Sequence, residues 1–255
     1  MSRDVHRLQQ AMARMLFDPD YVAAVRGGPV EGLTEAERAL LVRPDPRAWG
    51  TDRFRRARAV HALVDEYPVT TALIGVSAVD AFFSAPAFAT TLARRGSLAL
   101  DFGDWVRPRA GAIARLEQAL ARARRAEPRA GAGLATRPGV EALTMPGGIF
   151  AFYLEQRRSL GPDPAATLAR QARPRTRAPE PAGDPDSLLL ERSDDGQVQI
   201  GGASPALVAL LAFATTGRPR REVLAEARRL GCDEGDDDAL VTDLLAEGLL
   251  ASLPA

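Results

Sequence analysis

The stretch 186–255 constrains the fold more than any other part of the chain, because turn-forming residues divide it at short intervals. Two β-prone runs meet at Asp195-Gly196, and an Asp-Gly pair in that position strongly indicates a hairpin. Ser204-Pro205 then indicates a helix start, since the hydroxyl can cap the helix and proline fits its first position. Three apolar segments with helical spacing end at Gly217, Gly231 and Gly248, and a short apolar run, 249–253, follows.

A hairpin, three helices and a short final strand are the outline of a winged helix, so we predict a winged-helix-like domain here. The apolar positions that define its helices are Leu207, Leu210, Leu211, Ala214, Val223, Leu224, Ala227, Leu240, Val241, Leu244 and Leu245. Val140–Leu143 is a further β-prone run, and we expect it to join the same small antiparallel sheet across a long insertion.

The charge of the third predicted helix decides what such a domain can bind. Its region carries only acidic charges, at Asp233, Glu234, Asp236, Asp237, Asp238, Asp243 and Glu247, and no Arg or Lys. A helix in the major groove of DNA lies among phosphates and needs positive or neutral donors. We therefore expect no nucleic-acid partner. A groove beside this helix instead suits a neutral or basic peptide, which can also add as a strand to the sheet edge.

The residues before this stretch predict a domain of a different kind. Residues 1–127 read as all-helical, with a capping box at Thr34–Glu37 and a helix capped near Thr51-Asp52. On that helix we expect Phe54, Ala57, Val60 and Val64 to face inward and Arg53, Arg55, Arg56 and Arg58 mostly outward. Residues 128–255 form the winged-helix-like domain, with a Pro/Arg-rich loop at about 159–186. The predicted fold class is α+β, mostly α.

Composition restricts the remaining possibilities. Arginine is the only basic residue type other than histidine, and the 33 basic residues balance 33 acidic ones, so net charge indicates no particular partner. A single cysteine cannot form an internal disulfide, which favours a cytoplasmic protein. No run approaches the ~18 apolar residues of a membrane span, so we expect no membrane partner.

The histidines, the cysteine and the clustered acids do not have the spacing of a catalytic or metal-binding site. His6 and His61 are the only histidines, and no spacing links either to carboxylates. The acids at Asp236–Asp238 are explained by the dipole at a helix start. Cys232 lies in an acidic setting that disfavours the thiolate, so we expect an inert thiol. We predict a protein that is not an enzyme and holds neither a cofactor nor a metal.

The C-terminal motifs resemble a known domain family. Leu188–Arg192, Asp195–Ile200, Ser204–Leu211 and Leu244–Leu250 are similar to the leader-peptide recognition domain of ribosomal peptide natural-product pathways. The order of elements is that of the pyrroloquinoline-quinone chaperone type. The resemblance implies that this domain binds the leader of a precursor peptide.

The N-terminal motifs resemble the partner subunits of multinuclear non-haem iron oxidases. These motifs are Leu8-Gln9, Thr34–Leu40, Arg55–Arg58, Tyr67–Thr70, Leu73–Gly75, Phe82-Phe83 and Leu100–Trp105. The group includes the methanobactin and thiaglutamate pathway partners and a related family once described as DNA-binding. The resemblance implies a non-catalytic protein that binds a TIM-barrel oxidase and presents a precursor peptide for oxidative cysteine modification. The iron then belongs to the oxidase.

These expectations name two surfaces. The candidate leader contacts are Leu188, Leu190, Val198 and Ile200 on the hairpin and Leu240, Asp243, Leu244 and Glu247 on the third helix. The candidate oxidase interface is Arg53, Arg56, Tyr67 and Pro68. A winged-helix DNA-binding regulator is the main alternative, and a stand-alone enzyme built on the helical domain is a second.

Overall fold

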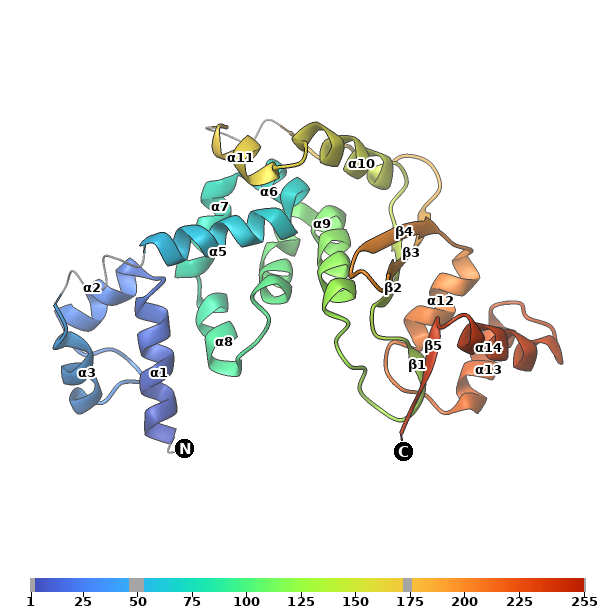
Figure 1. Ribbon diagram of the computed structural model, residues 1–255, viewed down its shortest axis with the longest axis horizontal. Helices are drawn as coiled ribbons and strands as arrows, with labels where there is room; N and C mark the ends of the chain where they lie inside the picture. Colours follow the sequence, from blue (N-terminus) through green and yellow to red (C-terminus); the bar gives the residue numbers. More distant parts are fainter. Residues whose placement is uncertain (1–2, 46–52, 172–175, 255) are drawn as a thin grey trace. The chain divides into compact units, whose positions relative to one another are not determined.

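The computed structural model describes residues 3–45, 53–171 and 176–254 (Figure 1). The fold is α+β and mostly helical, with small antiparallel sheets, as the sequence predicts. The chain forms two compact units. Unit 1 contains residues 1–114 and 156–177, and unit 2 contains residues 115–155 and 178–255.

Unit 1 is built from helices whose ends follow local sequence signals. In chain order they are α1 (Arg3–Met15), α2 (Pro19–Gly27), α3 (Glu35–Val42), α5 (Arg53–Glu66), α6 (Pro68–Ile74), α7 (Val76–Ala81), the 3-10 turn η1 (Phe82–Ser84), α8 (Pro86–Arg94), the first part of α9 (Leu98–Arg125) and α11 (Pro164–Ala169). Thr34 Oγ1 accepts the Glu37 N–H at 3.3 Å, and the Glu37 carboxylate accepts the Thr34 N–H at 2.7 Å, so the predicted capping box is confirmed. The predicted cap at Thr51-Asp52 lies outside the described residues.

Aromatic side chains form the centre of unit 1. Phe82 and Phe83 are fully buried, and Phe82 lies 5.4 Å from the Phe102 ring, centroid to centroid, in an edge-to-face arrangement. Tyr67 is also fully buried and donates a hydrogen bond from its hydroxyl to the Ala99 carbonyl at 2.7 Å. Edge-to-face pairs of this kind add to the free energy gained by burying the rings. The residues between Tyr67 and Trp105 therefore supply the core that was expected of them.

A helix that crosses a membrane must be both long and apolar. Among the described residues, no single helix is long and apolar enough to cross a membrane, while the bent pair Val76–Ser84 and Pro86–Arg94 meets that test jointly by length and composition.

Helix α9 crosses from one unit to the other, and it breaks near the crossing point. Pro108 lies inside the helix without an N–H to donate, and Gly111 has φ 53° and ψ −124°, a conformation that glycine tolerates. The units divide at 114/115, so the predicted boundary at 127/128 is wrong. Residues 115–127 belong to unit 2, because the apolar pattern of α9 continues through the break and hides it in the sequence.

The insertion after residue 155 also returns to unit 1, contrary to the predicted loop at 159–186. Helix α10 (Ile149–Leu160) extends into this range, and α11 packs on α5 and α6. Pro164, Ala165 and Leu168 are buried, so this part of the Pro/Arg-rich stretch packs through a small apolar face. Composition predicted a loop there because proline and arginine outnumber those few apolar residues.

Unit 2 contains two antiparallel sheets. The larger has the strand order β2 (Val140–Met145), β3 (Asp186–Arg192) and β4 (Val198–Gly202), and the smaller pairs β1 (Gly133–Thr136) with β5 (Leu250–Leu253). The turn between β3 and β4 contains Gly196 with φ 82°, which confirms the hairpin at Asp195-Gly196. Strand β2 pairs with β3, as expected for Val140–Leu143. The final strand, however, pairs with β1 and not with the hairpin.

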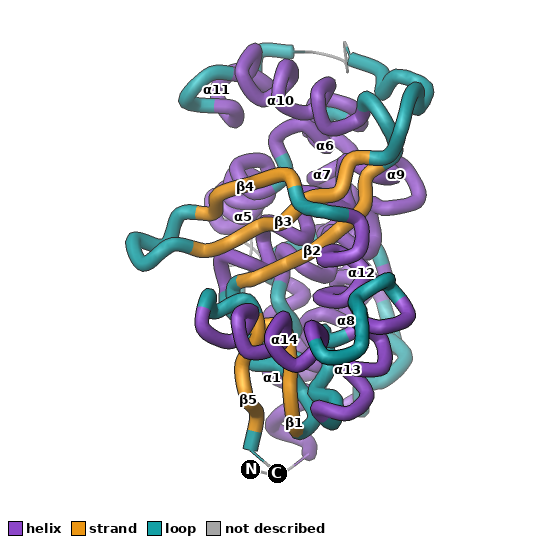
Figure 2. Tube along the Cα trace, turned by 90° about the vertical axis from the view of Figure 1, so that its right-hand side faces the viewer, coloured by secondary structure: helices purple, strands orange, loops and turns teal. Residues whose placement is uncertain are grey.

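Three helices follow the hairpin in the predicted order. They are α12 (Pro205–Phe213), α13 (Arg220–Arg229) and α14 (Asp236–Ala246), and Ser204 Oγ caps α12 by accepting the Leu207 N–H at 3.1 Å. Figure 2 shows the two sheets and these helices from the side. Their apolar faces meet in one core of buried residues: Leu134, Val140, Leu210, Leu211, Ala214, Val223, Ala227, Val241, Leu244, Leu249 and Leu250.

Both faces of the three-stranded sheet are covered. On one face, Ala142 and Leu189 lie opposite each other and pack against the helical core. On the other face, Glu141 lies opposite Leu190 and bonds to Arg122 of α9 through Nε at 3.2 Å. The end of α9 therefore lies over the face that carries Leu188 and Leu190, and the sheet is sandwiched within unit 2.

Candidate functional site

The hairpin residues predicted to contact a leader peptide all lie on the sheet face that α9 covers. Cross-strand partners point to the same face, and Leu190 pairs with Ile200 while Val198 pairs with Arg192. Leu188 is 3% exposed and Leu190 is fully buried, so both predictions are wrong. Val198 and Ile200 are half-buried. The continuous apolar run Leu188-Leu189-Leu190 could have indicated this, because a strand buried on both faces lacks alternation.

The backbone edge of the hairpin remains a possible attachment line for an extended peptide. Within the described part of the chain, no strand pairs with the outer edge of β4. Gly201 and Gly202 have open space where a Cβ would lie, so another backbone can approach closely. In Figures 1 and 2, however, β4 lies on the side of the sheet away from α14. The predicted groove between the hairpin edge and the third helix is therefore not formed as one site.

Helix α14 presents a different surface from the one predicted. Leu244 is 4% exposed and belongs to the core, which removes it from the candidate contacts. Leu240 is half-buried, and Asp243 and Glu247 are exposed. These two carboxylates make no hydrogen bond or ion pair with any described residue. Two of the predicted helix contacts are thus accessible charges, and one is a partly accessible apolar side chain.

Part of the negative charge on α14 is neutralised by α13. Arg228 Nε donates to Asp237 at 2.7 Å, and Arg220 donates to Asp238 at 2.8 Å. Burial acts to raise the pKa of Asp237, but the hydrogen bonds from Arg228 and the Gly235 N–H outweigh it and lower the pKa. Asp237 is therefore a buried, ionised anchor for the start of the helix. Asp233 and Asp236 are exposed, and their carboxylates bond to no described residue.

A pocket of about 230 Å³ opens between α12, α13 and α14, and we call it the helical pocket. Its walls are mostly aliphatic: Ser204, Ala206, Leu207, Leu210, Ala227, Leu230, Gly231, Cys232 and Leu240. Of the predicted leader contacts, only Leu240 reaches it. One sequence signal could have indicated this pocket. Leu230 is apolar and directly precedes the glycine that ends its helix, so no further turn of that helix covers its side chain.

Cys232 is the only thiol of the chain and lies in the wall of this pocket. Burial raises its pKa, and the carboxylates of Asp237, Asp236 and Asp233 raise it further, against a smaller opposite effect of Arg228. The thiol is therefore protonated and weakly nucleophilic at neutral pH, in line with the predicted inert side chain. Asp233 directly follows Cys232 in the chain, and Asp236 and Asp237 begin α14, so these acids lie close to the pocket wall.

The predicted oxidase interface is largely an interior feature of unit 1. Tyr67 is fully buried and Pro68 is buried at the start of α6. Arg56 donates to both oxygens of Asp80, at 2.6 and 2.8 Å, and to the Phe17 carbonyl. Three of the four predictions are therefore wrong, because a bidentate pair holds Arg56 inward. Arg53 begins α5, and its side chain lies outside the described residues.

The reversal on α5 exposes an aromatic residue that was expected to be buried. Phe54 is 73% exposed, which is the largest value among the exposed large hydrophobic residues. Ala57 and Arg58 are also exposed, while Val64 is buried as predicted. An exposed phenylalanine beside arginines is the composition typical of the centre of a protein interface. Inward and outward residues were confused because Arg56 is amphipathic and can itself fill an interior position.

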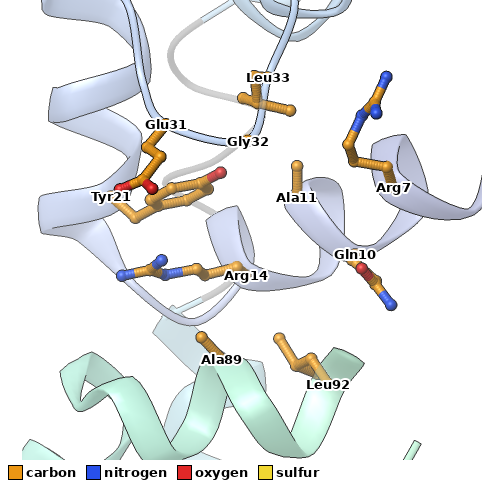
Figure 3. A pocket seen from close by; sticks show the side chains of 10 residues that line it. All are labelled: Arg7, Gln10, Ala11, Arg14, Tyr21, Glu31, Gly32, Leu33, Ala89 and Leu92. Carbon is orange, nitrogen blue, oxygen red and sulfur yellow. The ribbon is translucent and has the colours of Figure 1, made fainter. Parts of the chain in front are cut away.

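A second pocket, of about 300 Å³, lies among α1, α2, α8 and the loop before α3 (Figure 3). Glu31, Tyr21 and Arg14 lie on one side, and Arg7 and Gln10 lie on the other. The Arg14 guanidinium lies 4.1 Å from the Tyr21 ring centroid and donates to Asp18 at 3.2 Å. Arg7 donates to Glu37 at 2.7 Å. Both guanidinium groups are thus already bonded to carboxylates.

The polar groups that line this second pocket can hydrogen-bond a small ligand group. Burial raises the pKa of Tyr21; Arg14 lowers it and Asp18 raises it. Tyr21 is therefore a neutral phenol near neutral pH, able to donate or accept one hydrogen bond. Glu31 is exposed. A group with both a donor and an apolar part fits these walls, whereas an isolated anion would compete with the bonded carboxylates.

His61, Asp65 and Asp163 line one further pocket of unit 1 together with Arg157. His61 Nε2 lies 3.4 Å from the Asp65 carboxylate, one turn along the exposed face of α5, so it does not pack in the interior. Across the described ranges, no group of three or more His, Cys, Asp or Glu side chains converges as a metal site.

Comparison with known proteins adds no assignment. No family model matches the sequence, and no curated protein matches it either.

Proposed function

We propose that this chain is a non-catalytic partner protein of a multinuclear iron oxidase. In this proposal it binds the TIM-barrel oxidase and recruits the leader of a ribosomally made precursor peptide. The oxidase, which holds the iron, then modifies cysteine residues of the peptide oxidatively. Holding the leader raises the effective concentration of the core peptide at the oxidase active site.

The observation that carries this proposal is the charge of α14 and the turn before it. Four exposed carboxylates, those of Asp233, Asp236, Asp243 and Glu247, bond to no described residue. A surface of this kind attracts a basic polypeptide and repels a phosphate backbone. The arginines of α13 nearest to this helix, Arg220 and Arg228, are already paired with its acids.

The division of labour between the units follows from their surfaces. Unit 2 offers the acidic helix, the helical pocket and the free backbone edge of β4, which are features that bind peptide. Unit 1 offers Phe54 with exposed arginines on α5, which suits a folded protein partner. We therefore assign the leader to unit 2 and the oxidase to unit 1.

Co-purification tests the proposal. The full chain is co-expressed with a TIM-barrel iron oxidase and a short cysteine-containing peptide encoded beside its gene. We expect a stable complex by size-exclusion chromatography and oxidative modification of the peptide only when this chain is present. An oxidase that elutes alone, with and without peptide, contradicts the proposal.

A gel-shift assay tests the winged-helix regulator as the alternative. The acidic third helix predicts no sequence-specific band with DNA from the upstream region of its own gene. A specific band that survives competitor DNA would favour the regulator instead.

A further inference from the structure

We infer that the helical pocket holds one large apolar side chain of a peptide whose neighbouring residues are arginine or lysine. This inference rests on the proposed function and assigns the leader-binding surface within unit 2. It also places the peptide at the ends of three helices, separate from the β4 edge. The argument has three steps: the size of the pocket, its charge and its accessibility.

The size and lining of the pocket fit an aliphatic or aromatic side chain. Its volume is about 230 Å³, and a cavity of ~150 Å³ lined by aliphatic residues already accepts benzene. Leu207, Leu230 and Leu240 are each only partly buried, so apolar surface remains open to a ligand. A few side chains seated in well-packed, desolvated pockets commonly carry most of the affinity at an interface.

The charge around the pocket selects the flanking residues. Asp233 and Asp236 are exposed, and their carboxylates bond to no described residue. Asp233 directly follows Cys232 of the pocket wall, and Asp236 begins the helix whose Leu240 lines the pocket. Arg228 is the nearby cation, and it is held by Asp237 at 2.7 Å and by Glu234 at 3.5 Å. Carboxylates therefore outnumber guanidinium groups at this rim. An acidic peptide is repelled there, and a basic one is attracted.

The pocket can be monitored through a natural probe. Cys232 is the only cysteine of the chain, so a thiol reagent added to the intact protein reports on this wall alone. The ligand probe is a capped synthetic peptide with one phenylalanine flanked by arginines. Two matched peptides replace the phenylalanine with alanine or the arginines with glutamate.

The experiment measures the rate of Cys232 alkylation by iodoacetamide in the full chain at mildly alkaline pH. We expect the basic phenylalanine peptide to slow alkylation about tenfold at saturation, because a ligand that fills the pocket removes access in proportion to its occupancy. Neither matched peptide should protect at the same concentration. Protection should weaken with added salt, since the flanking contacts are exposed.

Charge variants supply a test that leaves the core intact. Asp233→Asn with Asp236→Asn removes two exposed carboxylates, and we expect about fivefold weaker binding of the basic peptide. Asp184→Asn with Asp194→Asn is the control that removes the same charge elsewhere in unit 2, because both residues are exposed and neither lines the pocket. We expect less than about twofold change for that pair.

The outcomes separate this inference from the proposed function. No protection by any peptide, or equal protection by the basic and acidic ones, overturns the pocket assignment. So does binding that weakens equally in the Asp184 and Asp194 variant and in the Asp233 and Asp236 variant. The complex with the oxidase is measured separately, so its absence overturns the proposed function while the alkylation result stands.

Discussion

At the scale of single residues, arginine–carboxylate pairs stabilise particular parts of the folded chain. Glu37 illustrates this in unit 1. Hydrogen bonds from Arg7, and from the Thr34 N–H and hydroxyl, lower the pKa of Glu37 from 4.5 to about 2. The depressed pKa means that the ionised carboxylate stabilises the folded state.

The pH dependence of this contribution can be stated with its sign. Since the pKa falls on folding, the stabilisation is fully present above pH 4.5 and is lost as the pH falls towards about 2. We expect Glu37→Gln to lower the melting temperature at neutral pH and to match the parent chain at the acid end. Calorimetry over a pH series measures the gap, with Glu31→Gln as the control. A gap that is the same at every pH would show that Glu37 acts otherwise.

Glu141 gives the corresponding prediction in unit 2. Its side chain is 10% exposed and accepts hydrogen bonds from Arg122 and from Arg129, the latter at 2.8 Å. We expect Glu141→Gln to cost about 2 kcal/mol, because the paired guanidinium groups lose their acceptor. Hydrogen exchange at the amides of β2 and β3 measures that loss within the unit.

The matched control for Glu141 is Glu191→Gln. Glu191 lies 3.8 Å from Arg137, and both side chains are more than two-fifths exposed. Pairs of this kind contribute less than about 1 kcal/mol. Equal exchange rates in the two variants would mean that the buried pair is no stronger than the exposed one.

At the scale of elements, turn chemistry made the order of strands and helices predictable. The hairpin at Asp195-Gly196, the capped start at Ser204 and the box at Thr34 are local signals, and each is confirmed. The burial of individual side chains was harder to predict, because it depends on which element packs against each face of the sheet. Leu188 and Leu190 are buried on the sheet face over which α9 lies, and although their apolar run indicates burial on both faces, it does not say which element covers them.

The connection between β1 and the helices also has a testable requirement. Gly133 has φ +92°, and a Cβ there would lie 2.3 Å from the Arg218 carbonyl oxygen. We expect Gly133→Ala to cost at least about 3 kcal/mol, because strain and overlap combine. Hydrogen exchange at the Leu134 amide, which donates to that same carbonyl, reports the opening.

Gly201→Ala is the control for this substitution. Gly201 lies in β4, has ordinary strand geometry and leaves open space at the Cβ position. We expect a change within about 0.5 kcal/mol. If both variants exchange alike at Leu134, the close approach at Gly133 does not hold the two segments together.

At the scale of the whole molecule, the two units carry different surfaces. Their charge was easier to predict from the sequence than the burial of their individual residues. Acidic character of the third helix could be read directly, since charge needs no knowledge of packing. The exposed face of α5 could not be predicted in this way, because Arg56 and Phe54 exchange their expected positions on the helix. Amphipathic and aromatic side chains both occur inside and outside, so their spacing alone is ambiguous.

Phe54 makes the partner proposal testable by substitution. We expect Phe54→Ala to weaken capture of the oxidase about tenfold or more, as truncation of an aromatic anchor commonly does. Leu40→Ala is the control, since Leu40 is 54% exposed elsewhere in unit 1. Unchanged capture by the Phe54 variant in a pull-down with purified oxidase would place the interface on another surface.

The pairing of β5 with β1 determines how this protein can be shortened. A fragment that begins at the hairpin lacks β1. The backbone N–H and C=O groups of Leu250–Leu253 that pair with β1 would then have no partner. Such an edge recruits strands from other molecules, so the fragment should precipitate on expression. A fragment for crystallisation of unit 2 should therefore start upstream of Arg115, so that it includes the end of α9 and strand β1.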